Sequence, residues 1–366
     1  KRNFTKLVSV ILFVQGDATT IGGMEEHGWA MVEWMAKNGV EHHIVRFNSI
    51  RNGEPRFQVE GIGSISLSEM KEKLSCKVLF HNTGHLIEQF AKLKEAFPGS
   101  IQVYRTGGNE VLQARLHNES LNHHERQKFW VDSINDSIDV LVTNSEFTEL
   151  RYEALGISRK LFFRAVGGTN HPLPNQKLTN LDDELTLFCA SRFVIYKNHY
   201  TLIELMGKLI QNGLRVKLYL AGGGPLLDNV KSQVESMGLS NNVVFLGEVS
   251  PEEVTKFLSR TDVYIQLSIE ENRVVEGGTY VHTEGMGRSV LAAISSATWV
   301  IAGNAGALPE IVYGGRGVTV NPHNADHAMQ ELNQWLENGC PTTEQTEEYS
   351  WDNYFEKYTE FIEVTP

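Results

Sequence analysis

Strand-like apolar runs alternate with helix-like segments along most of the chain, and this alternation constrains the fold more than any other feature. The first run, Leu7–Val14, is short and predicts a buried strand. The segment after it places Met31 and Trp34 on one helical face and ends near Asn38. Strands that alternate with helices predict an α/β fold in which helices cover both faces of a parallel sheet.

The alternation is interrupted once, which divides the chain in two. In the first part the further predicted strands are His43–Phe47, Val78–Phe80, Ile101–Tyr104 and Ile138–Thr143. The interruption, residues 170–184, is rich in Pro, Asn and Asp, as linkers are. Because 366 residues exceed one ordinary core, we predict two Rossmann-like, doubly wound domains, 1–175 and 176–346, and a C-terminal helix at 347–366.

A second α/β series follows the interruption. Its predicted strands are Leu185–Ala190, Val216–Ala221, Val243–Leu246, Val263–Leu267 and Trp299–Ala302. Its predicted helices are Tyr200–Asn212, Leu226–Met237, Pro251–Leu258 and 288–296. Ligands of doubly wound sheets bind outside the carboxyl ends of the strands. With two such domains, we expect the active site in a central cleft that both domains face.

Composition excludes several classes of protein. The net charge of −12, from 33 basic and 45 acidic residues, argues against a general nucleic-acid binder. The three cysteines are far apart and show no Cys-x-x-Cys pairing, so neither a disulfide framework nor a zinc site is indicated. No run reaches the roughly 20 apolar residues of a membrane span. We predict a cytoplasmic protein, and peripheral membrane contact and the oligomeric state stay open.

The stretch Glu284-Gly285-Met286-Gly287 carries the strongest local indication of a ligand. Its glycines let the backbone approach a ligand closely, and an apolar, helix-like run follows them. The start of a helix offers unpaired N–H groups to an anion. A carboxylate beside such an anion site suggests a ligand with both hydroxyls and phosphates, such as a nucleotide-sugar.

Two other sites would suit a diphosphate. Arg192 and Lys197 follow the strand that opens the second series and are either solvated surface charges or the cations that neutralise a leaving diphosphate. Gly22 and Gly23 lie between the first strand and the first helix. They form either an ordinary turn or a backbone that approaches a diphosphate at a helix N-terminus.

These motifs, in this order, resemble those of the family-4 glycosyltransferases. The Glu284–Gly287 stretch is similar to the family's Glu-Gly-Phe-Gly element, and Ser191–Lys197 is similar to its Gly-Arg…Lys-Gly element, with Asn198 in place of the final glycine. Ala221–Pro225 looks like its Gly-Asp-Gly-Pro turn, and Gly303–Glu310 looks like its Gly-Gly-x-Pro-Glu loop. The resemblance is stronger in the second half of the chain than in the first.

The resemblance implies the GT-B fold and a retaining transfer of sugar from a nucleotide-diphosphate sugar to an acceptor hydroxyl. The N-terminal domain would bind the acceptor, the C-terminal domain the donor, and the final helix would cross back to the first domain. The residues implied at the diphosphate are Arg192, Lys197, Gly22, Gly23, Gly285, Met286 and Gly287. Glu284 would hold the sugar hydroxyls, and the backbone at Gly247 and Val249 would meet the base. No cofactor and no bound metal would be needed.

The sequence departs from the family at two places. The family pairs the first Glu with a second Glu eight residues later, which holds the ribose hydroxyls, but this chain has Ala292 there. Losing such a charge-assisted hydrogen bond costs roughly 1.5–3 kcal/mol, or about ten- to a hundredfold in affinity. The segment 269–283 is also longer than usual, and we expect it to form a solvated flap, unless one of its carboxylates replaces the missing one.

Evidence for the acceptor side is thinner. His27, His81, Arg105 and Asn109 fall near predicted strand ends or in the first loop and are the candidates, although a lone His is more often a structural residue. The acceptor would be a glycan, a lipid-linked glycan or a glycosylated metabolite, as in polysaccharide assembly. Two alternatives remain: a non-catalytic glycosyltransferase-like partner subunit, which Ala292 favours, and another GT-B enzyme such as a nucleotide-sugar epimerase or a phosphorylase.

Overall fold

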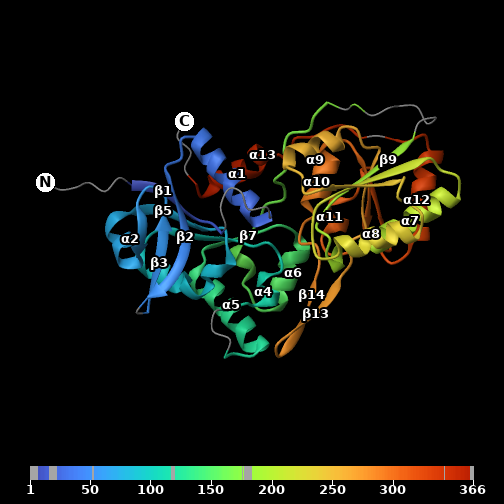
Figure 1. Ribbon diagram of the computed structural model, residues 1–366. Helices are drawn as coiled ribbons and strands as arrows, with labels where there is room; N and C mark the ends of the chain where they lie inside the picture. Colours follow the sequence, from blue (N-terminus) through green and yellow to red (C-terminus); the bar gives the residue numbers. More distant parts are fainter. Residues whose placement is uncertain are drawn as a thin grey trace. The chain divides into compact units, whose positions relative to one another are not determined.

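A computed structural model of the chain describes residues 7–15, 23–51, 53–116, 120–174, 176, 184–341 and 343–362. The chain divides into two compact units (Figure 1). Unit 1 consists of Lys1–Val166, Val274–Tyr280 and Trp351–Pro366, and unit 2 consists of Gly167–Arg273 and Val281–Ser350.

The unit boundaries differ from the expected divisions after residues 175 and 346. The chain enters unit 2 at Gly167 and leaves it after Ser350. Backbone hydrogen bonds explain this placement, because the N–H groups of Gly168 and Thr169 both donate to the carbonyl of Tyr349 at 2.9 Å. The two crossing segments are thereby held together. The Pro- and Asn-rich stretch 170–184 falls in unit 2, and the structure describes only residues 170–174, 176 and 184 of it.

Unit 1 contains an eight-stranded sheet in the order β4-β3-β2-β1-β5-β6-β7-β8. Its strands are β1 Leu7–Phe13, β2 His42–Arg51, β3 Glu54–Val59, β4 Gly63–Ser66, β5 Ser75–His81, β6 Ile101–Arg105, β7 Val140–Thr143 and β8 Phe162–Arg164. Neighbouring strands run parallel, as predicted, in the part of the sheet formed by β2, β1, β5, β6, β7 and β8. The sheet is nevertheless mixed, because β3 and β4 add an antiparallel extension at one edge that the sequence reading did not contain.

The helices of unit 1 include α1 Gly23–Lys37, α2 Leu67–Lys73, α3 Phe90–Ala96, α4 Glu110–Gln113, α5 His123–Ser137, α6 Glu146–Ala154 and α13 Trp351–Glu356. The 3-10 helices are η1 Gly84–Gln89, η2 Arg159–Leu161 and η4 Lys357–Glu360. The C-terminal α13 (red) lies beside α1 (blue) in Figure 1. Met31, Trp34 and Met35, on the inner face of α1, are buried in the same core cluster as Phe355 and Tyr358.

Unit 2 contains a six-stranded sheet in the order β11-β10-β9-β12-β15-β16. Its strands are β9 Leu185–Ala190, β10 Val216–Ala221, β11 Val243–Gly247, β12 Val263–Gln266, β15 Trp299–Gly303 and β16 Gly317–Val320. All neighbouring strands of this sheet run parallel. Numbered within the unit, the order is 3-2-1-4-5-6, that of a doubly wound dinucleotide-binding sheet, which places all carboxyl ends at one edge.

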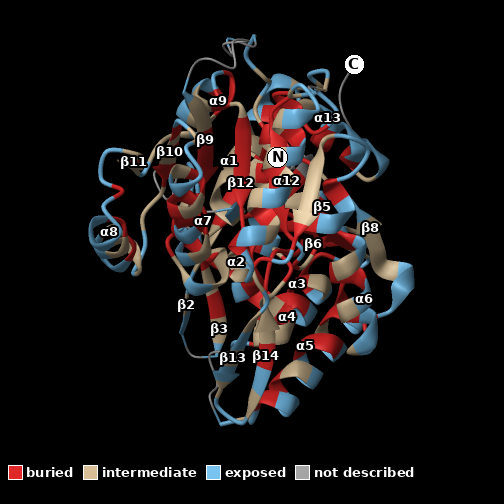
Figure 2. Ribbon diagram, turned by 90° about the vertical axis from the view of Figure 1, so that its right-hand side faces the viewer, coloured by how far each residue is buried: buried red, intermediate tan, exposed pale blue. Residues whose placement is uncertain are grey.

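The helices of unit 2 cover a sheet in which every residue of β12 (red in Figure 2) and of β15 is buried. They are η3 Ile195–Lys197, α7 His199–Gln211, α8 Leu227–Ser236, α9 Pro251–Leu258, α10 Arg288–Ser295, α11 Leu308–Ile311 and α12 Ala325–Glu337. Capping explains why α9 begins where it does: Ser250 and Glu253 form a capping box, and proline follows the cap. The predicted elements of this unit agree with the structure to within about two residues, which is the usual uncertainty of helix ends.

The long segment before Glu284 is an ordered hairpin and not the solvated flap that we expected. Its strands are β13 Glu271–Val275 and β14 Gly278–His282. The tip, Val274–Tyr280, belongs to unit 1, where Arg126 Nη2 donates to the carbonyl of Glu276 at 3.0 Å. At Gly278 a Cβ atom would lie 2.5 Å from Nδ1 of His123, so only glycine fits against the start of α5 without a shift.

Candidate active site

The predicted donor residues lie in the loops at the carboxyl edge of the unit 2 sheet. These loops are residues 191–198 after β9, 222–226 after β10, 248–250 after β11, 267–270 after β12 and 304–307 after β15. Because the strands are parallel, loops from different parts of the sequence meet at this edge. It is therefore the place in unit 2 where a ligand is expected.

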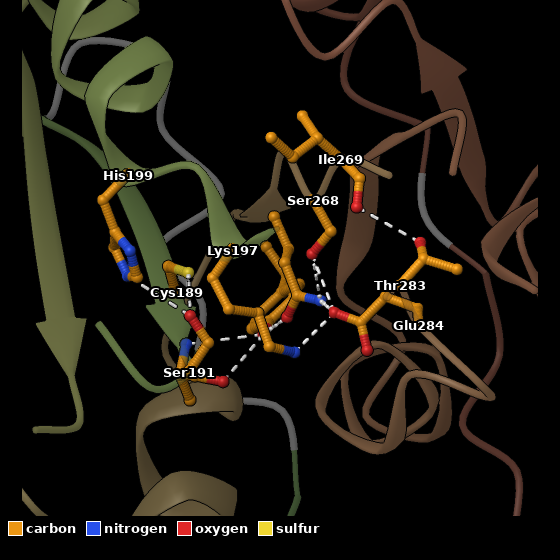
Figure 3. A network of polar contacts seen from close by, with 11 residues as sticks. Cys189, Ser191, Lys197, His199, Ser268, Ile269, Thr283 and Glu284 are labelled. Carbon is orange, nitrogen blue, oxygen red and sulfur yellow. Dashed lines mark hydrogen bonds and ion pairs between the residues drawn. The ribbon is translucent and has the colours of Figure 1, made fainter. Parts of the chain in front are cut away.

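Lys197 and Glu284 form an ion pair at this edge, with side chains only 13% and 8% exposed. Oε1 of Glu284 also accepts hydrogen bonds from Gln266 Nε2 at 2.8 Å and from Ser268 Oγ at 2.7 Å (Figure 3). The hydroxyl of Tyr264 donates to Oε1 of Gln266 at 2.9 Å and so orients that amide. All three donors to Glu284 reach Oε1, and no residue in the described part of the chain donates to Oε2. The carboxylate is thus fixed through one oxygen and free to bind a ligand through the other.

The electrostatics of this pair keep Lys197 charged. Burial acts to lower the pKa of Lys197, but the charges of Glu284 and Tyr196 outweigh burial and raise it. Removing two charges from water is costly, and close geometry with additional hydrogen bonds offsets that cost. We therefore interpret the Lys197–Glu284 ion pair as a preorganised polar site, and not as a contribution to the stability of the fold.

The loop that carries Lys197 is held by buried polar contacts. Ser191 Oγ lies 3.2 Å from Nε2 of His199 and 3.6 Å from Sγ of Cys189 (Figure 3). The ring of His199 stacks on Phe193 with centroids 4.1 Å apart. Burial lowers the pKa of His199 to about 3, and the positive charge of Lys197 acts in the same direction. This imidazole is therefore neutral near pH 7 and adds no positive charge to the site.

Asn198, which stands where the resembling family has glycine, has a left-handed backbone conformation with φ 51°. Asn tolerates this region better than most residues, so the turn survives the replacement. Its Nδ2 donates to the carbonyl of Pro322 at 2.7 Å. The departure from the family is therefore structurally conservative.

Two glycine turns support the backbone of the site without needing to touch a ligand. A Cβ atom on Gly222 would lie 2.1 Å from the carbonyl oxygen of Ser191, and one on Gly306 would lie 2.3 Å from that of Glu284. The N–H of Ala307 donates to the same Glu284 carbonyl at 2.9 Å. The Gly-rich loops after β10 and β15 thus pack directly against the segments that carry Lys197 and Glu284.

The remaining donor candidates lie along the same edge. Arg192 is exposed, and its side chain has no ion pair or hydrogen bond to any residue that the structure describes. Gly285, Met286 and Gly287 are buried, and Gly287, with φ 90°, directly precedes α10. The first N–H groups of a helix have no partner within it and face outward from this end. Ala292 is half-buried in α10.

The base-binding candidates lie at the end of β11. Gly247 has φ 73°, and its carbonyl accepts a hydrogen bond from the N–H of Gly222 at 2.7 Å. Val249 is half-buried. Of the paired glycines in the first half, Gly22 lies outside the described residues, and Gly23 is the exposed first residue of α1.

The two histidines proposed for the acceptor side lie in the interior of unit 1. The His27 side chain is fully buried among aromatic rings, with Nε2 3.2 Å from the hydroxyl of Tyr358. His81 is fully buried too, and burial lowers its pKa to about 3. Both are core residues. The sequence places them near a strand end or in the first loop, but it does not show which way the side chains point.

Arg105 and Asn109 remain as acceptor candidates. Arg105 ends β6 at the carboxyl edge of the unit 1 sheet and is 6% exposed. Asn109 is half-buried, and its Oδ1 accepts a hydrogen bond from Arg151 Nη1 at 3.5 Å. Arg105 is the last residue of β6 and Asn109 lies in the loop that follows, but only Arg105 is enclosed.

Sequence reasoning missed Gln266 and Ser268, which hold Glu284. Both are buried, at the end of β12 and just after it. A buried amide needs hydrogen-bond partners, so a Gln within an apolar strand was the available signal. Within the described ranges, no group of three or more His, Cys, Asp or Glu side chains could hold a metal ion. Nor is any helix among the described residues long and apolar enough to cross a membrane.

Comparison with known proteins shows what the second half of the chain is similar to. Residues 174–351, which include Lys197 and Glu284, match the family model described as "Glycosyl transferases group 1". The chain is 26% identical over 247 residues to the GDP-mannose-dependent alpha-(1-6)-phosphatidylinositol monomannoside mannosyltransferase of Mycobacterium tuberculosis, with 63% of each chain covered. It is 30% identical over 116 residues to the alpha-monoglucosyldiacylglycerol synthase of Streptococcus pneumoniae, covering 32% of this chain and 26% of that protein. The chain thus spans less than two thirds of the length of these relatives.

Solved structures share the fold over nearly the whole chain. HepE of Anabaena in complex with UDP-glucose has a TM-score of 0.65 at 15% identity, covering 96% of this chain and 95% of that one. Sucrose-phosphate synthase of Thermosynechococcus elongatus has a TM-score of 0.66 at 17% identity, covering 97% and 95%. The predicted α/β fold of GT-B type and the resemblance to GT-B glycosyltransferases are confirmed.

Proposed function

Because its fold is GT-B and its second half matches the group 1 glycosyltransferases, we propose that this chain transfers a sugar from a nucleotide-diphosphate sugar to an acceptor hydroxyl. One observation carries the proposal: the Lys197–Glu284 pair, fixed by Gln266 and Ser268, lies at the carboxyl edge of a doubly wound sheet. Such an edge is where nucleotides bind in this architecture. Unit 2 would bind the donor, and unit 1 the acceptor.

The residues of unit 2 divide the work according to their charge and exposure. The guanidinium of Arg192, which is exposed and has no partner among the described residues, and the ammonium of Lys197 would offset the negative charge that grows on the leaving diphosphate. N–H groups at the start of α10, beside Met286 and Gly287, would add partial positive charge. The free Oε2 of Glu284 would accept hydrogen bonds from the sugar hydroxyls.

The mechanism that fits these groups is a front-face displacement with retention of configuration. The acceptor hydroxyl would attack the anomeric carbon from the side of the leaving diphosphate, and a phosphate oxygen would take its proton. No enzyme nucleophile and no metal ion is required, so orientation and electrostatic stabilisation supply the rate enhancement. Glu284 does not reach the reacting carbon as a nucleophile in this scheme, because Lys197 and its other partners hold it in place for the sugar hydroxyls.

The relatives suggest which substrates to try first. The mycobacterial relative is named for GDP-mannose and a phosphatidylinositol mannoside, the pneumococcal one for a glucosyl lipid, and HepE was solved with UDP-glucose. The purified full-length chain would be incubated with GDP-mannose or UDP-glucose and with glycolipid or glycan acceptors. Glycosylated product and free nucleoside diphosphate would be detected by mass spectrometry, and the anomeric configuration by proton NMR.

We expect transfer with retention, and a loss of roughly a hundredfold or more in Lys197→Met, as for removal of one charge-stabilising group. Lys256→Met is the matched control, because Lys256 is exposed on α9. Formation of an epimer or a sugar phosphate without transfer would instead identify another GT-B enzyme. Absence of turnover in a chain that still supports an active partner would identify a non-catalytic subunit.

A further inference from the structure

Arg105 is a buried cation in unit 1 for which the described residues provide no counter-ion. Its side chain is 6% exposed, and within the described residues no carboxylate oxygen lies within 4.0 Å of it. Its Nη1 donates to the thioether Sδ of Met24 at 2.8 Å, and the phenols of Tyr354 and Tyr358 act on its charge. A thioether is a weak acceptor and a phenol is uncharged, so neither neutralises a guanidinium.

The neighbouring carboxylate does not fill this role. Glu110 acts on Arg105 through charge without forming an ion pair with it, and its oxygens accept hydrogen bonds from other donors. They accept the N–H groups of Gly107 at 2.7 Å and Gly108 at 2.9 Å and the hydroxyl of Thr106 at 2.8 Å. Although burial acts to lower the pKa of Arg105, Tyr354 and Tyr358 raise it, so Arg105 stays charged. An enclosed charge without a partner is costly unless an anion completes it.

The surroundings of Arg105 are those of a ligand edge. It ends β6, between β5 and β7 in the parallel part of the unit 1 sheet. Asn82, directly after β5, donates from Nδ2 to the carbonyl of Met24 at 2.6 Å. Its Oδ1 is buried and has no hydrogen-bond partner among the described residues. Arg105 and Asn82 thus meet at one residue, Met24, which stands at the start of α1.

We propose that unit 1 binds an acceptor that carries a phosphate or carboxylate group beside its hydroxyls, and that Arg105 pairs with this anionic group once the Met24 side chain moves aside. A guanidinium can bind either oxyanion through two parallel hydrogen bonds, which the single thioether cannot provide. The unpartnered Oδ1 of Asn82 would accept a hydrogen bond from a hydroxyl of the same molecule. This inference rests on the proposed transfer to a hydroxyl acceptor and names its chemical class.

The test is a calorimetric titration of the full chain with glycerol 3-phosphate, with glycerol as the uncharged control. UDP and GDP are present in excess, so that anion binding to unit 2 is suppressed. We expect Arg105→Gln to weaken glycerol 3-phosphate binding at least about tenfold, as for loss of a charge-assisted hydrogen bond. Arg56→Gln removes a charge from another part of unit 1, on β3, and should change the affinity by less than about twofold, as for a remote surface charge.

Met24→Ala keeps the inference testable if Arg105→Gln does not fold. Removing the thioether frees the guanidinium, so Met24→Ala should bind glycerol 3-phosphate more tightly than the wild type. If folded Arg105→Gln and the wild type bind glycerol 3-phosphate equally well, or if Met24→Ala binds it more weakly than the wild type, the inference is overturned. Arg105 would then have only a structural role in unit 1.

The source of the anionic group is decided by a second titration. Vesicles of phosphatidylcholine with and without phosphatidylinositol replace glycerol 3-phosphate. Binding that depends on Arg105 only with phosphatidylinositol indicates a lipid headgroup, dependence with glycerol 3-phosphate indicates a soluble anion, and dependence with neither overturns the inference. Nucleotide-sugar binding by Arg105→Gln is measured separately. If that binding persists while the predicted anion dependence is absent, the inferred acceptor class is wrong and the proposed transferase function is not affected.

Discussion

At the scale of single residues, the site depends on how the two oxygens of Glu284 are used. Lys197, Gln266 and Ser268 all donate to Oε1, which fixes the carboxylate before any ligand arrives. Preorganisation of this kind lowers the reorganisation cost of binding and of the transition state. A substitution at Gln266 or Ser268 would therefore change the donor site although neither side chain needs to touch the sugar.

Ala292→Glu should restore a second carboxylate to the donor site. Ala292 is half-buried in α10, the helix that begins directly after Gly287. If a carboxylate there reaches the ribose hydroxyls, nucleotide affinity should rise about ten- to a hundredfold, because such hydrogen bonds contribute roughly 1.5–3 kcal/mol. Calorimetry with the nucleoside diphosphate measures this, and an unchanged or weaker dissociation constant would show that Ala292 is not the missing partner of Glu284.

The sequence was sufficient for some residues of the site and not for others. Lys197 and Glu284 could be predicted because each belongs to a motif with a chemical reason for its residue types. The partners Gln266 and Ser268 could not, because a polar residue in or beside a buried strand does not reveal what it bonds to. The burial of His27 could not be predicted for a similar reason: its place after the first loop is visible in the sequence, but the aromatic rings of α13 that enclose it come from the far end of the chain.

At the scale of elements, the sequence predicted regular alternation well and exceptions poorly. The strands of unit 2 stood out because buried parallel strands are short, continuous apolar runs. The hairpin β13–β14 did not stand out, because residues of β13 alternate between exposed and half-buried. Its contacts with α5 also depend on Arg126 and His123, which are far away in the sequence. The strands β3 and β4 were missed too, although Phe57 and Val59 of β3 are buried and alternate with a polar residue.

Gly306→Ala tests whether the loop after β15 supports the backbone at Glu284. Gly306 has φ 55°, and a Cβ atom there would lie 2.3 Å from the carbonyl oxygen of Glu284. Gly314→Ala is the matched control, because Gly314 has φ 64° but open space around the added atom. Both variants carry the strain of a left-handed alanine, of order 1–2 kcal/mol.

We expect Gly306→Ala to lose donor affinity and thermal stability beyond that shared strain, because the backbone at Glu284 must shift. Thermal unfolding and nucleotide titration of both variants give the comparison. Equal stability and equal affinity of the two variants would mean that the Gly306 turn does not position Glu284.

At the scale of the whole molecule, each unit has a buried neutral histidine, and this makes stability depend on pH. Burial lowers the pKa of His81 in unit 1 and of His199 in unit 2 from 6.5 to about 3. Between these values the unfolded chain binds protons that the folded chain does not, so stability is present above pH 6.5 and is lost as the pH falls toward 3.

The melting temperature should therefore fall progressively on acidification through this range. His81→Gln removes one of the two groups and should flatten the dependence, while retaining an amide that can bond to Gln102. Differential scanning calorimetry across the range measures the slope. A slope that is the same in the variant and the wild type would show that His81 does not titrate on unfolding.

The central claim is that unit 2 is a nucleotide-sugar site organised by Lys197 and Glu284. The most direct measurement is a thermal-shift screen of the wild type and of Lys197→Met against UDP-, GDP-, ADP- and dTDP-linked sugars. A ligand that binds only the folded state stabilises it by RT ln(1 + [L]/Kd), so the melting temperature rises with the logarithm of the ligand concentration once that concentration exceeds the dissociation constant. We predict that at least one of these donors raises the melting temperature of the wild type and that Lys197→Met abolishes the shift. No shift with any of them at millimolar concentration, or an equal shift in the variant, would contradict the claim.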